Sequence, residues 1–162
     1  MKYMKILGID PGYGRVGWGV VEYKDNKAKY LDCGCIETPA KSLFSDRINT
    51  IFDEVSKVIK EYRIEEVAVE SLFFNTNQKT AMLASQARGV IILAGVRSGL
   101  SVFDYTPLQV KQALIGYGRA DKKQIQTMLA FHLQIKEDFK QDDAADAVAV
   151  ALTHAYTNKR LK

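Results

Sequence analysis

The chain has 162 residues, of which 47% are hydrophobic and 26% are charged, and it contains no repeat, low-complexity tract or linker. These features are typical of one globular domain, residues 1–162, with enough chain for a proper core. The longest uncharged apolar run, residues 89–96, is far shorter than the roughly 20 residues of a membrane helix, so we expect a soluble protein without membrane association.

Lys and Arg outnumber Asp and Glu by 23 to 19, which gives a net charge of +4. If some of the acidic residues are held by metal ions, the remaining surface is more basic still. This balance favours a polyanionic partner such as a nucleic acid.

Strands are predicted at the start of the chain, over residues 4–10, 14–24 and 28–37. The polar segment 25–27 separates the second strand from the third and predicts a hairpin. Residues 44–62 follow with apolar side chains at spacings of three and four, which indicates an amphipathic helix that covers a sheet. These apolar residues are Phe44, Ile48, Ile51, Phe52, Val55, Val58, Ile59 and Tyr62.

Helices and strands alternate in the remainder of the chain. Thr106 is a suitable cap and Pro107 a suitable first residue for one of these helices. Three antiparallel strands followed by this alternation predict an α/β three-layer fold, with a mixed five-stranded sheet flanked by helices. We expect strands at 66–70 and 102–105, and helices at about 76–98, from 107 onward, at 121–134 and at 142–158.

The N-terminus and the cysteines indicate a cytoplasmic protein. Met1 leads directly into a strand that contains Gly8 and Asp10, without the apolar stretch and cleavage site of a secretory signal. Cys33 and Cys35 are two residues apart on one face of a strand, which is a poor geometry for a mutual disulfide. We therefore expect reduced cysteines in the core.

Carboxylates from distant parts of the sequence are predicted to meet at one point. Asp10 and Glu70 each end an apolar strand, and Asp143 and Asp146 are one turn apart at the start of a helix. In α/β sheets, sites form at the carboxyl ends of the strands. Clustered carboxylates repel one another unless cations hold them ionised, so the pattern predicts a metal site.

Each of these residues also has a purely structural interpretation. Asp142 and Asp143 could cap the helix that starts there, and Asp146 could complement the helix dipole. Asp10 could be a turn residue, and Glu70 could end its strand in an exposed ion pair. The conjunction of all four favours the metal site.

The chemistry of such a site is phosphodiester hydrolysis. An attacking water must become more acidic, a leaving oxygen must be stabilised, and negative charge must be neutralised, which two cations about 3.5 to 4 Å apart accomplish together. Oxygen ligands without clustered His or Cys favour Mg²⁺ or Mn²⁺ over zinc. His132 and His154 are isolated on helices, and we read both as structural or surface residues.

Basic and aromatic residues suggest how a nucleic acid would be bound. Lys111, Arg119, Lys122 and Lys123 lie around a glycine-rich loop at residues 116–119. They form either a phosphate-binding surface or an ordinary solvated face. The adjacent aromatics Phe73 and Phe74 follow Glu70, and one of them either contacts bases or packs in the core.

Seven short motifs run through nearly the whole chain, and their order, spacing and total length resemble the RuvC family of Holliday-junction resolvases. The motifs are Gly8-Ile9-Asp10-Pro11-Gly12, Gly17-Trp18-Gly19, Val69-Glu70 running into Phe73, Gln86-Ala87-Arg88-Gly89, Gln109-Val110-Lys111-Gln112, residues 116–122, and Asp143-Ala144-Ala145-Asp146-Ala147. The resemblance implies a ribonuclease-H-like fold and a homodimeric bacterial endonuclease that resolves four-way DNA junctions in recombination and repair.

The resemblance also implies roles for particular residues. The catalytic, metal-binding quartet falls on Asp10, Glu70, Asp143 and Asp146, which would hold two Mg²⁺, with Mn²⁺ as a substitute. Lys111 and Lys122 match residues that contact DNA near the scissile phosphate, and Phe73 matches an aromatic at the opened junction. Asp142 departs from the pattern as a fifth carboxylate. The RuvA and RuvB branch-migration machinery is implied as a partner.

Other functions stay open at this point. The acidic cluster alone is also typical of ribonuclease-H-like nucleases that act on hybrids or on branched DNA. A non-catalytic junction-binding module would have no reason to keep four acids, and an actin-like ATPase would need a second domain. The helix near residues 81–93 is apolar around most of its circumference, which favours a two-fold dimer.

Overall fold

The computed structural model describes residues 3–72, 78–135 and 139–158. The predicted contact residues Phe73 and Phe74 lie outside these ranges. Within them, no helix is long and apolar enough to cross a membrane. The elements are β1 (Met4–Asp10), β2 (Arg15–Lys24), β3 (Lys27–Glu37), α1 (Phe44–Tyr62), β4 (Glu66–Glu70), α2 (Gln78–Arg97), β5 (Ser101–Tyr105), α3 (Pro107–Ile115), α4 (Lys122–Leu133) and α5 (Asp142–Thr157).

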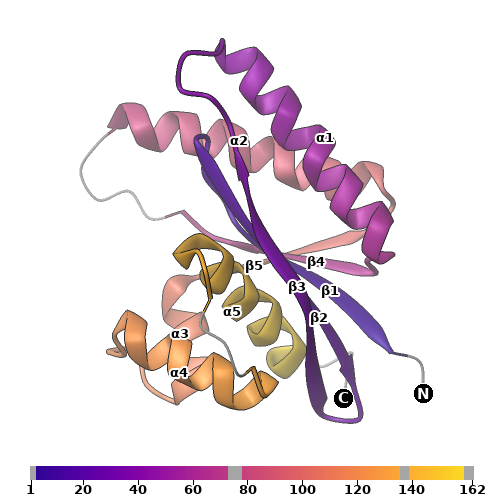
Figure 1. Ribbon diagram of the computed structural model, residues 1–162, viewed down its shortest axis with the longest axis vertical. Helices are drawn as coiled ribbons and strands as arrows, with labels where there is room; N and C mark the ends of the chain where they lie inside the picture. The colour runs from indigo at the N-terminus through magenta and orange to yellow at the C-terminus, as the bar shows by residue number, and fades with distance from the viewer. Residues whose placement is uncertain (1–2, 73–77, 136–138, 159–162) are drawn as a thin grey trace.

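The predicted three-layer α/β architecture is confirmed. The five-stranded sheet has the order β3-β2-β1-β4-β5. The β1–β2 and β2–β3 pairs are antiparallel, whereas β1–β4 and β4–β5 are parallel, so the sheet is mixed as expected. Figure 1 shows α1 and α2 on one face of the sheet and α3, α4 and α5 on the other.

Local sequence explains the hairpin and the first helix. Asp25 and Asn26 both have positive φ, at 50° and 61°, which Asp and Asn tolerate and which a two-residue hairpin turn requires. Helix α1 buries Ile51 and Val55, together with two more members of the predicted apolar stripe, against the sheet. The stripe thus fixes the side of the sheet that α1 covers.

Helix α5 lies directly on the backbone of the sheet. A Cβ atom at Gly17 would stand 1.9 Å from the carbonyl oxygen of Asp143, and one at Gly8 would stand 2.1 Å from that of Ala147. Glycine is therefore required at these two crossings. Every α5 residue from 144 to 155 except Asp146 is buried, so the helix belongs to the core along most of its length.

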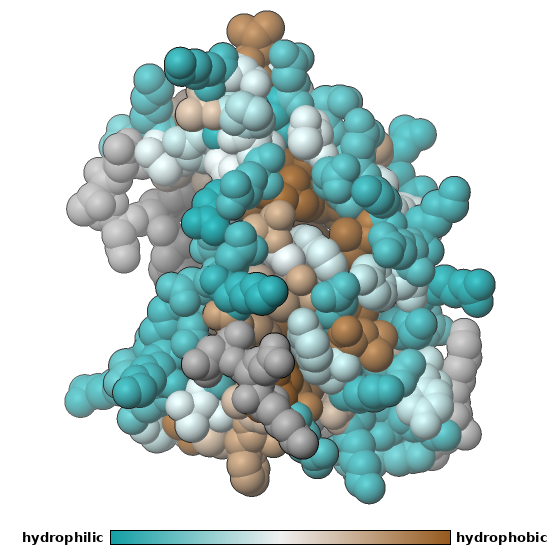
Figure 2. Space-filling view, viewed as in Figure 1, coloured by the Kyte–Doolittle hydropathy of each residue, from teal (hydrophilic) through white to brown (hydrophobic). Residues whose placement is uncertain are grey.

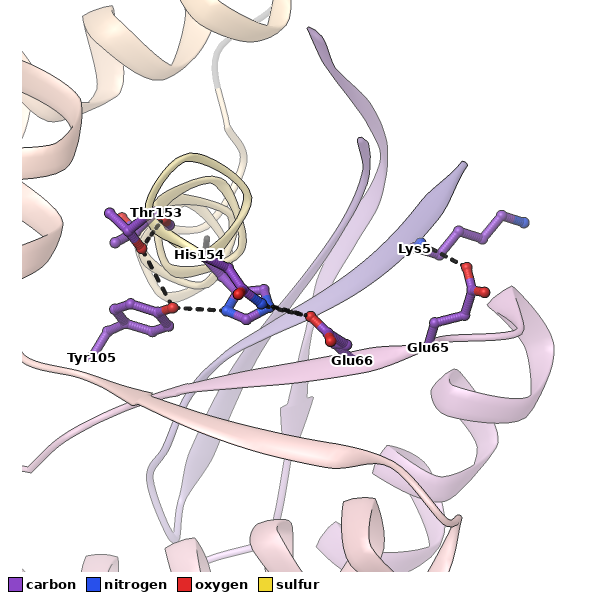
Figure 3. Close-up of polar contacts among 8 residues, drawn as sticks. Lys5, Glu65, Glu66, Tyr105, Thr153 and His154 are labelled. Atoms are coloured by element: carbon purple, nitrogen blue, oxygen red, sulfur yellow. Dashed lines mark hydrogen bonds and ion pairs between the residues drawn. The ribbon is translucent and has the colours of Figure 1, made fainter. Parts of the chain in front are cut away.

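A buried polar chain joins the C-terminal half of α5 to the sheet (Figure 3). The His154 ring is fully buried, with Nε2 2.6 Å from Glu66 Oε2 and Nδ1 2.8 Å from the Tyr105 hydroxyl. Burial lowers the pKa of His154 despite the Glu66 carboxylate. Because a carboxylate only accepts, Nε2–H donates to Glu66 and Nδ1 accepts from Tyr105. His154 is thus structural as predicted, but it is not isolated, and His132 contacts the Tyr156 hydroxyl.

The two cysteines are free, as expected, but they are half-buried, whereas we expected them in the core. The Tyr30 hydroxyl donates to Cys33 Sγ at 3.3 Å. Burial raises the pKa of both thiols. Their strand β3 is the edge of the sheet, so both side chains stay partly exposed, although Cys33 packs against the core.

Candidate active site

The first two carboxylates meet because β1 and β4 are neighbouring parallel strands. Their register pairs Ile9 with Val69, so the next residues, Asp10 and Glu70, leave the same edge of the sheet. This is the carboxyl-end position predicted from the sequence. A side-chain hydrogen bond joins the two carboxyl groups.

Helix α5 brings the other two carboxylates to that edge. Asp143 and Asp146 lie in its first turns, and Gly17 allows the backbone of Asp143 to rest on β2. Oxygen atoms of Asp10, Asp143 and Asp146 all lie within 4.8 Å of one another. Glu70 is outside this three-residue group, but it lines a pocket with Asp146 and its charge raises the pKa of Asp10, so it lies beside the other three carboxylates.

Burial and mutual repulsion make the quartet a poor place for negative charge alone. Burial and then the charges of Glu70 and Asp146 raise the pKa of Asp10 from 3.8 to about 8. Burial also raises the pKa of Glu70, although the hydrogen bond from Asp10 opposes the shift. Burial raises the pKa of Asp146, which Lys122 partly offsets. Burial and repulsion therefore favour a proton on the Asp10–Glu70 pair when no cation is bound.

Asp142 stands apart from this cluster. Its carboxylate is exposed and lies 3.2 Å from Lys122 Nζ, and it accepts a hydrogen bond from Gln126 at 3.1 Å. The hydrogen bond from Lys122 is the largest cause that lowers the pKa of Asp142. The suggestion that Asp142 or Asp143 caps α5 is wrong, because the N-cap residue is Gln141 and it makes no side-chain cap hydrogen bond.

Two of the predicted basic residues reach the site. Lys122 Nζ lies 3.4 Å from Asp146 Oδ2. Lys111 and Lys122 line a pocket of about 210 Å³ together with Glu70 and Asp146. Cationic side chains from α3 and α4 therefore stand beside the carboxylates, where a phosphate bound at the site would find its counter-charges.

The other two predicted basic residues do not line this pocket. Arg119 and Lys123 are exposed on the loop before α4 and on the helix itself. Asp121 caps α4, because its side chain accepts from the Gln124 N–H at 2.8 Å, and this places Lys122 at the first helical position. The cap explains why Lys122 points to the carboxylates while its neighbour Lys123 does not reach them.

Arg15 is a site residue that the sequence reasoning missed. Its Nε lies 3.3 Å from Asp143 Oδ2, and its Nη2 lies 3.5 Å from Glu37 Oε1. The β1–β2 register pairs Asp10 with Gly17. Arg15 lies two residues before Gly17, at the start of β2, next to the turn that connects it to β1. If the pairing of β1 with β2 had been worked out from the sequence, it would have placed Arg15 near Asp10.

The donor set fits a divalent cation. All four candidate ligands are carboxylates, and oxygens of three of them lie within 4.8 Å of one another. The raised pKa of Asp10 indicates that a positive charge here would stabilise the ionised carboxylates. Oxygen-only ligands suit Mg²⁺ or Mn²⁺ better than zinc.

Comparisons with known proteins agree with the geometry. The family model described as "Crossover junction endodeoxyribonuclease RuvC" matches residues 6–154. The protein of that name from Clostridioides difficile is 51% identical over 156 residues, covering 96% of this chain and 92% of the relative. The Thermus thermophilus RuvC structure is 36% identical with a TM-score of 0.89, covering 97% of this chain and 96% of that one. The same protein in complex with Holliday junction substrate has a TM-score of 0.91 at the same identity and coverage.

Proposed function

The chain belongs to the RuvC family of crossover junction endodeoxyribonucleases, and we propose that it resolves four-way DNA junctions by hydrolytic nicks at the carboxylate cluster. The observation that carries this proposal is that Glu70 and Asp146 share one pocket with Lys111 and Lys122. Asp146 is also one of three carboxylates, with Asp10 and Asp143, whose oxygens lie within 4.8 Å of one another. A non-catalytic junction-binding module would gain nothing from burying acids that repel DNA. The likeness to a structure solved with a Holliday junction favours branched DNA over hybrids as substrate.

The metal we propose is Mg²⁺, two per site, with Mn²⁺ able to replace it. Asp10, Glu70, Asp143 and Asp146 would hold the ions, which supply an acidified attacking water and charge neutralisation at the phosphate. Asp10 would be one of these ligands, because its oxygens lie within 4.8 Å of those of Asp143 and Asp146. It must lose its proton to serve in this way, because its pKa is raised to about 8 without metal.

The basic residues are proposed to orient the scissile phosphate. Lys122 now bridges Asp142 and Asp146, at 3.2 and 3.4 Å. A phosphate entering the pocket would offer Lys122 and Lys111 a stronger acceptor than an exposed carboxylate. If the Lys122 ammonium group paired with the phosphate instead of with Asp146, an Asp146 oxygen would become available to a cation. Arg119 and Lys123, which are exposed, remain proposed contacts with more distant parts of the DNA, and Phe73 and Phe74 remain proposed base contacts.

We also propose that the protein acts as a homodimer through α2. Met82, Leu93 and Val96 are 65%, 49% and 56% exposed and recur at helical spacing along one face. Gly89 lies on that face, and a Cβ there would meet nothing within 4 Å. A two-fold axis along this stripe would bury it and would pair two active sites for two nicks. Association with RuvA and RuvB, and a cytoplasmic location, are proposed from family membership.

Cleavage assays on defined DNA test the proposal. A synthetic four-way junction, a linear duplex of the same sequence and an RNA–DNA hybrid are incubated with the protein in Mg²⁺ or in EDTA. We expect paired nicks in the junction only, and only with the metal. Glu70→Gln should abolish nicking and leave junction binding intact. Equal cleavage of the hybrid, or cleavage in EDTA, would refute the assignment.

The proposed contact between Phe73 and the DNA bases is tested separately. Phe73→Ala should impair junction distortion, measured by fluorescence energy transfer between labelled arms, and leave the unfolding temperature nearly unchanged. A core role would instead cost about 3 to 5 kcal/mol of stability. Phe74→Ala is the matched variant.

A further inference from the structure

A large groove lies away from the carboxylate cluster, between α1 and the edge strand β3. Its volume is about 590 Å³. Figure 2 looks onto this side and shows hydrophobic residues in a hollow between α1 and β3, with hydrophilic residues on both flanks. Nothing in the proposed cleavage reaction uses it.

The floor of the groove is an aromatic platform. Trp18 on β2 and Tyr62 at the end of α1 lie with ring centroids 5.9 Å apart. Gly34 on β3 lets the Trp18 ring lie close to the β3 backbone, since a Cβ there would approach the indole to 2.9 Å. Trp18 is only partly buried, and it lines the groove together with Tyr62.

The walls of the groove are acidic in a chain whose net charge is +4. Asp32 and Glu37 from β3, and Glu54 and Glu61 from α1, line it, against one cation, Lys57. Lys57 lies 3.9 Å from Glu54, and Arg15 lies 3.5 Å from Glu37, so the negative charges of Asp32 and Glu61 are not balanced by either cation. This surface repels DNA phosphates, and an aromatic floor between carboxylates suits Lys or Arg side chains.

The strand beside the groove has an open edge. β3 is the terminal strand of the sheet, with β2 as its one neighbour. The Cys33 N–H is covered by its neighbour, since it donates to Asp32 Oδ1 at 2.8 Å. Among described residues, no backbone hydrogen bond joins residues 34–37 to anything beyond β2. Such an edge can accept another strand.

We propose that this groove is a docking site for a protein partner that presents an extended, basic segment. The segment pairs with residues 34–37 of β3, and alternate Lys or Arg side chains lie over Trp18 and between Glu54 and Glu61. Charge complementarity and the open edge together select this occupant, because a helix could not use the edge and an acidic or neutral strand could not use the walls. The proposal does not depend on the cleavage chemistry.

The single tryptophan of the chain reports directly on the groove. The probe is an acetylated, amidated octapeptide of alternating Lys and Val, titrated into the full-length protein while Trp18 emission is recorded. We expect a saturable change in emission. The double variant Glu54→Gln/Glu61→Gln should weaken binding by about 5-fold or more, while junction cleavage without peptide stays unchanged.

Two further peptides separate the proposed mode from its alternatives. A peptide with Glu in place of Lys should not bind, and one with Pro in place of every Val should bind at least about 10-fold more weakly, because Pro cannot donate to a strand edge. Equal binding of the Pro peptide, or no Trp18 response to the Lys peptide at millimolar concentration, overturns the proposal. The proposal is also overturned if the protein assembles beyond a dimer and the double variant Glu54→Gln/Glu61→Gln abolishes that assembly. A second copy of the chain would then be the occupant of the groove.

Discussion

Replacing Asp10 by Asn should stabilise the metal-free protein while abolishing its nuclease activity. Burial and the neighbouring carboxylates raise the pKa of Asp10 from 3.8 to about 8. One pKa unit corresponds to about 1.4 kcal/mol, so the full ionisation of this group costs the fold up to about 6 kcal/mol. Glu70 shares the proton with Asp10, so the amide should recover part of this cost, about 2 to 4 kcal/mol at pH 9.

The sign of the pH dependence follows from proton linkage. Between about pH 4 and pH 8 the folded protein keeps a proton on Asp10 that the unfolded chain has lost. With respect to this group, the stability of the wild type is therefore highest below pH 4, falls as the pH rises from 4 to 8, and is level above that range. The Asp10→Asn variant lacks this fall, so the gap between the two proteins should be small near pH 4 and widest above pH 8.

Urea unfolding in EDTA at pH 5, 7 and 9 measures the gap, and Asp142→Asn is the control. Asp142 is exposed and paired with Lys122, so its amide should give no gain in stability at any of these pH values. Saturating Mg²⁺ should stabilise the wild type and narrow the gap. An Asp10→Asn variant that is less stable than the wild type at pH 9 would refute the electrostatic reasoning.

Other outcomes follow from the same geometry. Asp143→Asn should lower the nicking rate at least about 100-fold and Asp142→Asn should be nearly silent, as measured on a junction in Mg²⁺; the reverse result would shift the helical ligand by one residue. Lys111→Ala and Lys122→Ala should each lower the slope of log affinity against log salt by about 0.7 to 0.9, measured by fluorescence anisotropy without cleavage, and an unchanged slope would exclude phosphate contact. Leu93→Arg should yield a folded monomer in light scattering, and a persistent dimer would place the interface elsewhere.

Periodicity predicted α1 in full, because its buried face is written in local spacing and needs no knowledge of the rest of the chain. The positions of Asp10 and Glu70 were also predictable, since strand ends and parallel pairing bring them together. The roles of Arg15 and Gln141 were not. Arg15 meets Asp143 through the β1–β2 register. Gln141 occupies the N-cap position of α5 in an extended conformation without a side-chain cap hydrogen bond, and local sequence favoured the aspartates that follow it.

The close seating of α5 has a consequence for how a substrate is accommodated. The helix that carries Asp143 and Asp146 is also buried from residue 144 to residue 155, apart from Asp146 itself, and touches the sheet through Gly17. Elements packed in this way open only when the whole domain unfolds, whereas adjustable sites use less protected segments. The carboxylates are therefore held at a fixed spacing before DNA arrives. A rigid duplex must be bent or unpaired to bring its phosphate to them, whereas a branched junction is already open at its centre, so discrimination between the two can reside in the stiffness of the DNA.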